Sequence, residues 1–159
     1  MADTYDTADV IRAAGCSAQD LKNWLRRGYL VAIEPEETVR GRSRTFDTED
    51  AIYIAIVTAL TRAGLSAQSA AWAAARALAP GDADIYDAGK RFLLVVGAAR
   101  FGSTQPTTAI IEDTTDTRLI RAAVSGDGSG PIEAAVAFVD LTDIIGRVCA
   151  ALTGESKHV

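Results

Sequence analysis

Two short helix patterns separated by only three residues constrain the fold of this chain most. Apolar residues recur at helical spacing in residues 7–14 and again in residues 18–27. Between them, Gly15 can adopt the left-handed conformation that ends a helix, and Ser17 can cap the next helix at once. The sequence therefore predicts a helix-turn-helix at the N-terminus.

The second of these helices has two unlike sides. Leu21, Trp24 and Leu25 fall on one side at the spacing of a buried stripe. The other side carries amide and basic groups, which are the types that read base edges and neutralise phosphates: Gln19, Lys22, Asn23 and Arg26. We therefore expect this helix to face nucleic acid.

A basic segment follows the second helix. Residues 29–33 have strand propensity, residues 35–37 interrupt it, and residues 39–46 can return as the partner strand. Three arginines occupy alternate positions of the returning strand, so their guanidinium groups would project from one face: Arg40, Arg42 and Arg44. Such a row suits a phosphate backbone, although solvated strand charges are the alternative.

The charge distribution limits where nucleic acid can bind. The formal net charge is −5, which would repel DNA if it were spread evenly. Residues 17–46 hold six basic and four acidic residues, whereas residues 80–159 hold eleven acidic and seven basic ones. The sequence thus indicates one DNA-facing surface, in the N-terminal part.

Two further helices are expected next. Residues 47–50 place capping and acidic groups at a helix start, and apolar residues then follow the helical period as far as Gly64. Ser66 starts another helix, which continues through an alanine-rich tract to residue 79 with Trp72 as its one bulky anchor. Small residues allow close helix packing, within the domain or against a second subunit.

The remainder reads as a small α/β unit of about 70 residues. Residues 91–98, 107–112 and 132–139 are the expected strands, and residues 116–124 and 141–152 the expected helices. The fold class is therefore α+β, with a winged helix-turn-helix domain that is mostly helical with a two-stranded wing at residues 1–80 and a small α/β domain at residues 81–159. That second domain is expected to mediate dimerisation or sensing.

The N-terminal half resembles the winged helix-turn-helix DNA-binding domain of the MerR family. The resemblance covers residues 5–78 and rests on the order and spacing of five segments: 15–17 at the turn, Leu21-Lys22-x-Trp24, 27–30 before the wing, 44–50 after it, and Leu60-x-x-Ala63-Gly64-Leu65-Ser66. It implies that Lys22 replaces a DNA-contacting arginine, Trp24 a tyrosine of the same helix, and that Arg44 is the wing arginine that approaches phosphate.

This sequence departs from the family pattern in several places. Lysine lacks the bidentate fork of arginine, so we expect weaker base reading at Lys22. Trp24 contacts phosphate or packs in the core. Arg27, at the end of the same helix, contacts DNA or satisfies the terminal carbonyls of the helix. The family's long coiled-coil helix after residue 80, with its metal-binding cysteines or drug-binding domain, is not visible. The expected DNA-binding residues are Ser17, Gln19, Lys22, Asn23, Trp24, Arg26, Arg40, Arg42 and Arg44.

Other classes of protein find little support in the sequence. The N-terminus lacks the features of a signal peptide, and no apolar run reaches membrane-spanning length, so we expect a cytoplasmic, nucleoid-associated protein of bacterial or phage type with no membrane partner. Cys16 and Cys149 have no metal-ligand spacing. The glycines of residues 126–130 precede a proline and read as a plain turn, not a phosphate loop. We expect no catalytic residues, cofactor or metal.

Three functions are compatible with these patterns. The first is a sequence-specific transcriptional regulator that binds double-stranded DNA as a homodimer or higher homo-oligomer. The second is an architectural or packaging DNA-binding protein of phage type, such as an excisionase or a small terminase subunit. The third is a protein-interaction module that has lost DNA contact. The sequence gives neither the operator nor an effector.

Overall fold

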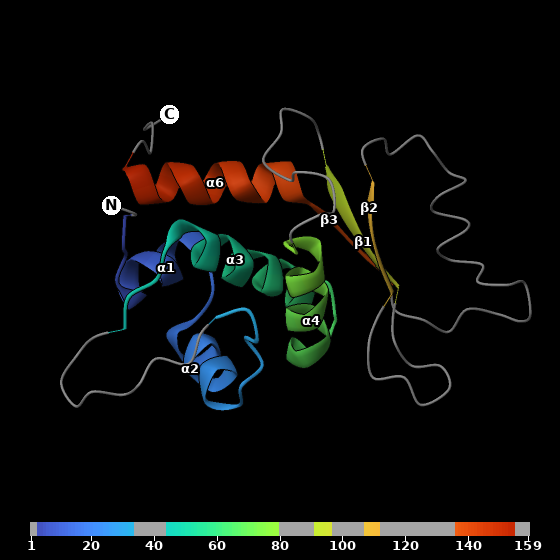
Figure 1. Ribbon diagram of the computed structural model, residues 1–159, viewed down its shortest axis with the longest axis horizontal. Coiled ribbons are helices and arrows are strands. Elements are labelled where there is room, and N and C mark those ends of the chain that lie inside the picture. Colours follow the sequence, from blue (N-terminus) through green and yellow to red (C-terminus); the bar gives the residue numbers. More distant parts are fainter. Residues whose placement is uncertain (1–2, 34–43, 80–90, 97–106, 112–135, 155–159) are drawn as a thin grey trace, which may run out of the picture.

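The computed structural model describes residues 3–33, 44–79, 91–96, 107–111 and 136–154. Within these ranges the chain is mostly helical with one small antiparallel sheet (Figure 1). The elements, in chain order, are α1 (Thr7–Ala14), α2 (Ala18–Arg26), α3 (Thr48–Arg62), α4 (Ala67–Ala77), β1 (Phe92–Val96), β2 (Thr107–Ile111), β3 (Val136–Asp140) and α6 (Leu141–Thr153). The expected helix at residues 116–124 lies outside the described residues.

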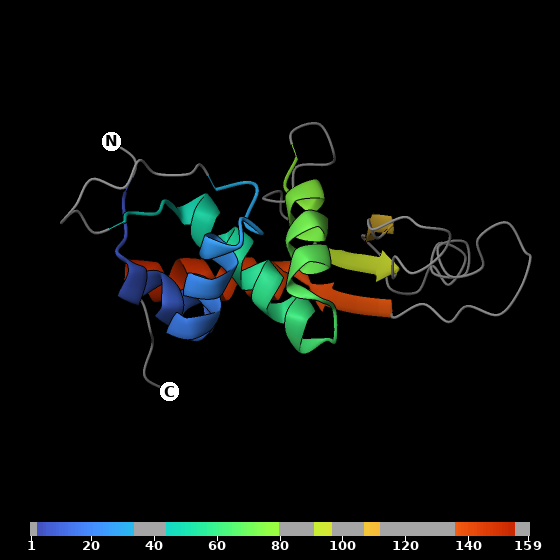
Figure 2. The ribbon, with the colours of Figure 1, turned by 90° about the horizontal axis from the view of Figure 1, so that it is seen from below.

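Helix α3 is the centre of the helical part. Figure 1 shows α6 on one side of it and α2 on the other, with α1 and α4 near its two ends, and Figure 2 shows the sheet beyond α4. Nine of its fifteen residues are buried, including the whole run from Ala51 to Thr58. A helix that is apolar on every side is stable only when other elements surround it. The uninterrupted apolar run therefore fixes α3 as the core element.

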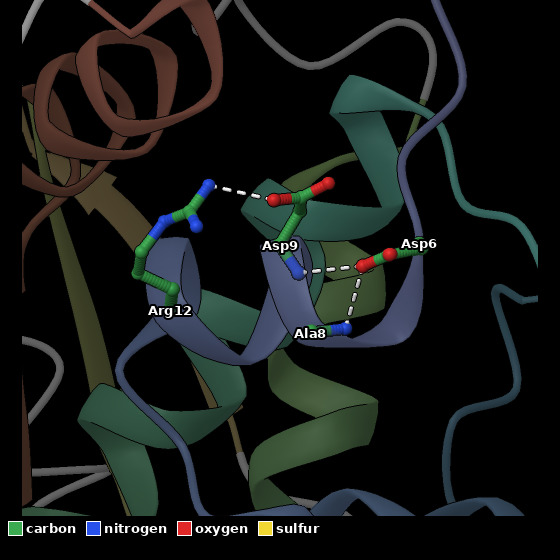
Figure 3. Close-up of polar contacts among 4 residues, drawn as sticks. All are labelled: Asp6, Ala8, Asp9 and Arg12. Carbon is green, nitrogen blue, oxygen red and sulfur yellow. Dashed lines mark hydrogen bonds and ion pairs between the residues drawn. The ribbon is translucent and has the colours of Figure 1, made fainter.

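Side-chain caps fix the starts of the helices. At α1 the Asp6 carboxylate accepts hydrogen bonds from the amides of Ala8 and Asp9, at 2.8 and 2.9 Å (Figure 3). At α3, Asp47 and Asp50 form a reciprocal capping box. At α6, the Asp140 side chain accepts from the Asp143 amide at 2.9 Å. Each cap satisfies amides that have no partner within the helix.

The strands form a sheet in the order β2-β1-β3, and both pairings are antiparallel. Leu93 lies opposite Val139, and both are buried on the face that also carries Ala137. Phe92 and Phe138 project from the other face and stack with their ring centroids 4.9 Å apart. The three predicted strands are thus present, with described bounds at residues 92–96, 107–111 and 136–140.

The alanine-rich helix α4 packs through its small residues. Its buried residues are all alanines, at positions 70, 71, 73, 74 and 77, whereas Trp72 is only half-buried. The prediction that Trp72 anchors this helix is therefore wrong. Alanine lets the α4 backbone come close to α3, and the Tyr53 hydroxyl of α3 donates a hydrogen bond of 3.0 Å to the Ala71 carbonyl.

The predicted first strand of the wing is wrong. Residues 29–33 form no strand: residues 31 and 32 lie in a turn, and the amides of Val31 and Ile33 donate hydrogen bonds to the carbonyls of Tyr29 and Leu30. The burial of two side chains explains why the chain turns here. Leu30 and Ile33 are both buried in the core. In a strand, residues three apart point to opposite faces, so a strand could not bury both on one side.

The returning end of the predicted wing pairs with a different partner. Phe46 forms an antiparallel bridge with Tyr5, with hydrogen bonds of 2.8 and 3.0 Å. Residues 39–43, the rest of that predicted strand, lie outside the described residues.

Helix α6 packs against α1 and α3, so the end of the chain shares the core of its beginning (Figure 1). Leu141, Ile144 and Val148 are its buried residues, while Ile145, Cys149 and Leu152 are partly buried against the same core. The boundary between two domains at residue 80 stays a prediction.

We predict that Tyr53→Phe flattens the loss of stability at high pH. Burial raises the pKa of Tyr53 from 10.0 to about 12, so its neutral form stabilises the fold below pH 10 and that contribution is lost as the pH rises through about 12. The melting temperature should fall less steeply with pH between pH 10 and about pH 12 for Tyr53→Phe than for the wild type. Tyr29→Phe, at a half-buried ring, is the control. Equal slopes for all three proteins would contradict the assignment.

Candidate nucleic-acid interface

The turn between α1 and α2 is held by backbone geometry and a cap. Gly15 ends α1 in the left-handed region with φ of 67°, where a side chain would be strained. The Ser17 hydroxyl accepts from the Asp20 amide at 3.0 Å and donates to the Asp20 carboxylate at 2.6 Å. Ser17, an expected DNA contact, is exposed, but its hydroxyl is engaged in starting α2.

Arg62 ties this turn to the central helix. Its guanidinium, at the end of α3, donates a hydrogen bond of 2.6 Å to the Gly15 carbonyl. That carbonyl follows the last turn of α1, where a cation also offsets the negative end of the helix dipole. Arg62 is therefore a positioning residue for the helix-turn-helix. Sequence reasoning missed it, because the two residues are 47 positions apart and no local pattern joins them.

The outward side of α2 carries a connected polar row. Gln19 donates its amide to Asn23 Oδ1 at 3.1 Å, and Arg26 reaches the same oxygen at 3.5 Å. Lys22, Gln19 and Arg26 are exposed, and Asn23 is half-buried. These contacts follow from i, i+3 and i, i+4 spacing on a helix. The structure thus joins three of the four residues predicted for this face, and Lys22 is exposed on the same helix.

The basic residues after α2 are partly described. Arg27, the C-cap of α2, is exposed and lies over the Tyr29 ring, with its guanidinium carbon 5.9 Å from the ring centroid. The guanidinium of Arg44 lies 5.5 Å from the Phe46 ring centroid, and its side chain is half-buried. Arg40 and Arg42 lie outside the described residues, so the predicted row of three arginines stays a prediction.

Comparison with known proteins identifies this part of the chain. Residues 5–74 match the profile of the family described as MerR HTH family regulatory protein. The N-terminal part is a MerR-like helix-turn-helix domain. No curated protein matches the chain. The matched range runs from the bridge at Tyr5 through α1, α2 and α3 into α4, so the turn, the row on α2 and Arg62 all belong to the MerR-like domain.

Trp24 belongs to the core of the MerR-like domain. Its side chain is 8% exposed, and it faces inward with Leu21, which is 1% exposed. Of the two roles left open for Trp24, core packing is the one that its position supports. Its ring also forms part of the wall of a hollow beside the turn.

This hollow lies between the start of α2, the end of α3 and the start of α4. It encloses about 600 Å³ and is lined by Gly15, Cys16, Ser17, Asp20, Trp24, Thr58, Thr61, Arg62, Leu65 and Ala67. Burial, assisted by the Asp20 charge, raises the pKa of the Cys16 thiol. A thiol with a raised pKa is a poor nucleophile at neutral pH, so the hollow offers no activated cysteine.

The described residues contain neither a cluster of metal ligands nor a membrane-spanning helix. In those ranges, no group of three or more His, Cys, Asp or Glu side chains is arranged to hold a metal ion. None of the helices found there is long and apolar enough to cross a membrane.

We predict that Arg62→Met loosens the MerR-like domain. The variant loses the bond to the Gly15 carbonyl, so the free energy of unfolding in urea should fall by about 1 kcal/mol. Arg76→Met is the matched control, because Arg76 is also exposed in the last turn of a helix. Equal losses in the two variants would show that the contact between Arg62 and Gly15 does not stabilise the turn.

Proposed function

We propose that the protein is a sequence-specific, DNA-binding transcriptional regulator that binds duplex DNA as a homodimer. The observation that carries the proposal is the exposed row on α2 in a domain that matches a family of regulatory proteins. Amides of Gln19 and Asn23 have the chemistry that reads base edges, and Lys22 and Arg26 neutralise phosphates.

The arrangement of elements supports contact through α2. Helix α2 lies on the opposite side of α3 from α6 (Figure 1). Asp143 and Arg147 form an exposed ion pair on α6, the helix on that opposite side. A single face then meets the DNA, which agrees with an overall charge of −5.

The proposal includes parts for which the support is the sequence. Arg40, Arg42 and Arg44, in the segment between α2 and α3, contact phosphate, and the C-terminal part mediates dimerisation or sensing. The protein is not an enzyme and acts in the cytoplasm, on the nucleoid. Whether it represses or activates depends on the spacing of the two MerR-like domains in the dimer.

We predict that Lys22→Ala weakens duplex binding at every sequence tested. Loss of one phosphate contact should also reduce the slope of log affinity against log salt by about 1. Fluorescence anisotropy of labelled duplexes over a salt series measures both quantities. Arg147→Ala on α6 is the control, because it removes the same charge on the opposite side of α3. Equal effects of the two variants would show that net charge, not α2, governs binding.

Selection of bound sites from random duplex DNA tests sequence specificity. A homodimeric regulator should enrich near-palindromic sites whose half-sites lie about one helical turn, or a multiple of it, apart. Retention of duplex without enrichment of any sequence would overturn the regulator in favour of an architectural role. Failure to retain any duplex would favour a protein-interaction module.

A further inference from the structure

One aromatic side chain of the sheet is exposed at the middle of a strand. Phe138 is 42% exposed and is the third of the five residues of β3. Its ring stacks on Phe92 with an interplanar angle of 10° and a centroid distance of 4.9 Å. Its neighbours Ala137 and Val139 are buried on the other face, so the exposure is not a fraying of the strand.

Strand β3 lies at the border of the sheet. The strand order is β2-β1-β3, and the pairing that the described residues give to β3 is the one with β1. In Figure 2, β3 forms the lower border of the sheet, below β1. The strand sequence Val-Ala-Phe-Val-Asp contains no proline or lysine, which are residues that commonly protect an edge strand from pairing.

The hydrogen-bond alternation shows which backbone groups face outward. The Leu141 amide donates to the Arg91 carbonyl at 2.9 Å, which continues the register of β1 and β3 by one residue. In an antiparallel pair, hydrogen-bonded positions alternate. Ala137 and Val139 therefore direct their backbone groups toward β1, and the N–H and C=O of Phe138 point away from it.

We propose that β3 pairs with β3 of a second copy of this chain, about a two-fold axis that passes beside Phe138. Antiparallel pairing of a strand with its own copy places one residue opposite itself, and the middle residue of β3 is the exposed phenylalanine. The two Phe138 residues exchange two backbone hydrogen bonds. The described strands then form one sheet in the order β2-β1-β3-β3-β1-β2.

Side-chain chemistry favours a second copy as the occupant. Residues opposite each other in an antiparallel pair project from the same face, so the two pairs of Phe92 and Phe138 form a row of four rings. The charged residue of the strand, Asp140, lies opposite Val136 and not opposite another acid. Self-pairing thus covers the exposed ring without placing like charges together.

The pairing of two β3 strands would be the dimer contact of the proposed regulator. The pairing itself does not depend on DNA binding; only its role in holding two MerR-like domains on DNA rests on the proposed function. Sedimentation equilibrium of the full chain without DNA tests it. We expect a dimer for the wild type, a monomer for Phe138→Lys, where two cations would face each other at the axis, and a dimer for the control Gln68→Lys at an exposed position of α4. A monomeric wild type, or a Phe138→Lys variant as dimeric as the control, overturns the proposal.

A cysteine cross-link decides the matter if Phe138→Lys fails to fold by circular dichroism. In a Cys16→Ser, Cys149→Ser background, Phe138→Cys places two thiols on residues whose Cα atoms lie about 5.5 Å apart across the axis, which a disulfide can span. Oxidation should give a covalent dimer with Phe138→Cys and not with Gln68→Cys. Equal cross-linking of both variants, or none with Phe138→Cys, refutes the interface.

The outcome on DNA is read separately. A wild-type dimer that Phe138→Lys dissociates, but that binds no duplex, refutes the proposed function and leaves this interface in place. A protein that binds duplex DNA, but whose dimer survives Phe138→Lys, keeps the proposed function and refutes this interface.

Discussion

The described structure depends on the burial of α3. The run from Ala51 to Thr58 has no polar face, so it needs neighbours on every side. Helices α1, α4 and α6 and strand β3 pack against α3, and α2 lies on the side opposite α6. This requirement brings the end of the chain against its beginning, because α6 fills the side of α3 opposite α2. The outward row on α2 is then held on a rigid support, which a recognition surface needs.

Local rules predicted the helices well. The caps at Ser17, Asp47 and Ser66 lie where side-chain oxygens precede apolar periods, because capping depends on residues only two or three positions apart. The face of α2 was predictable for the same reason: four residues at helical spacing lie together whatever the helix packs against.

Tertiary context decided the features that the sequence did not predict correctly. Residues 29–33 have the composition of a strand, yet the core takes Leu30 and Ile33 together and the backbone turns. Phe46 pairs with Tyr5, 41 residues before it, and Arg62 with Gly15, 47 residues before it. Contacts at such separations leave no periodic signal in the sequence. Trp72 was expected inside because of its size, but alanines take the close contact.

The alanine contact between α4 and α3 makes this part of the fold sensitive to substitutions that enlarge a side chain. Its five buried positions already carry the smallest side chain with a Cβ, so a change to glycine removes little apolar volume and costs mainly helix propensity. Any larger side chain instead pushes the two backbones apart. Substitution at these positions is therefore limited by steric fit and not by hydrophobicity, and glycine is the change that the contact admits.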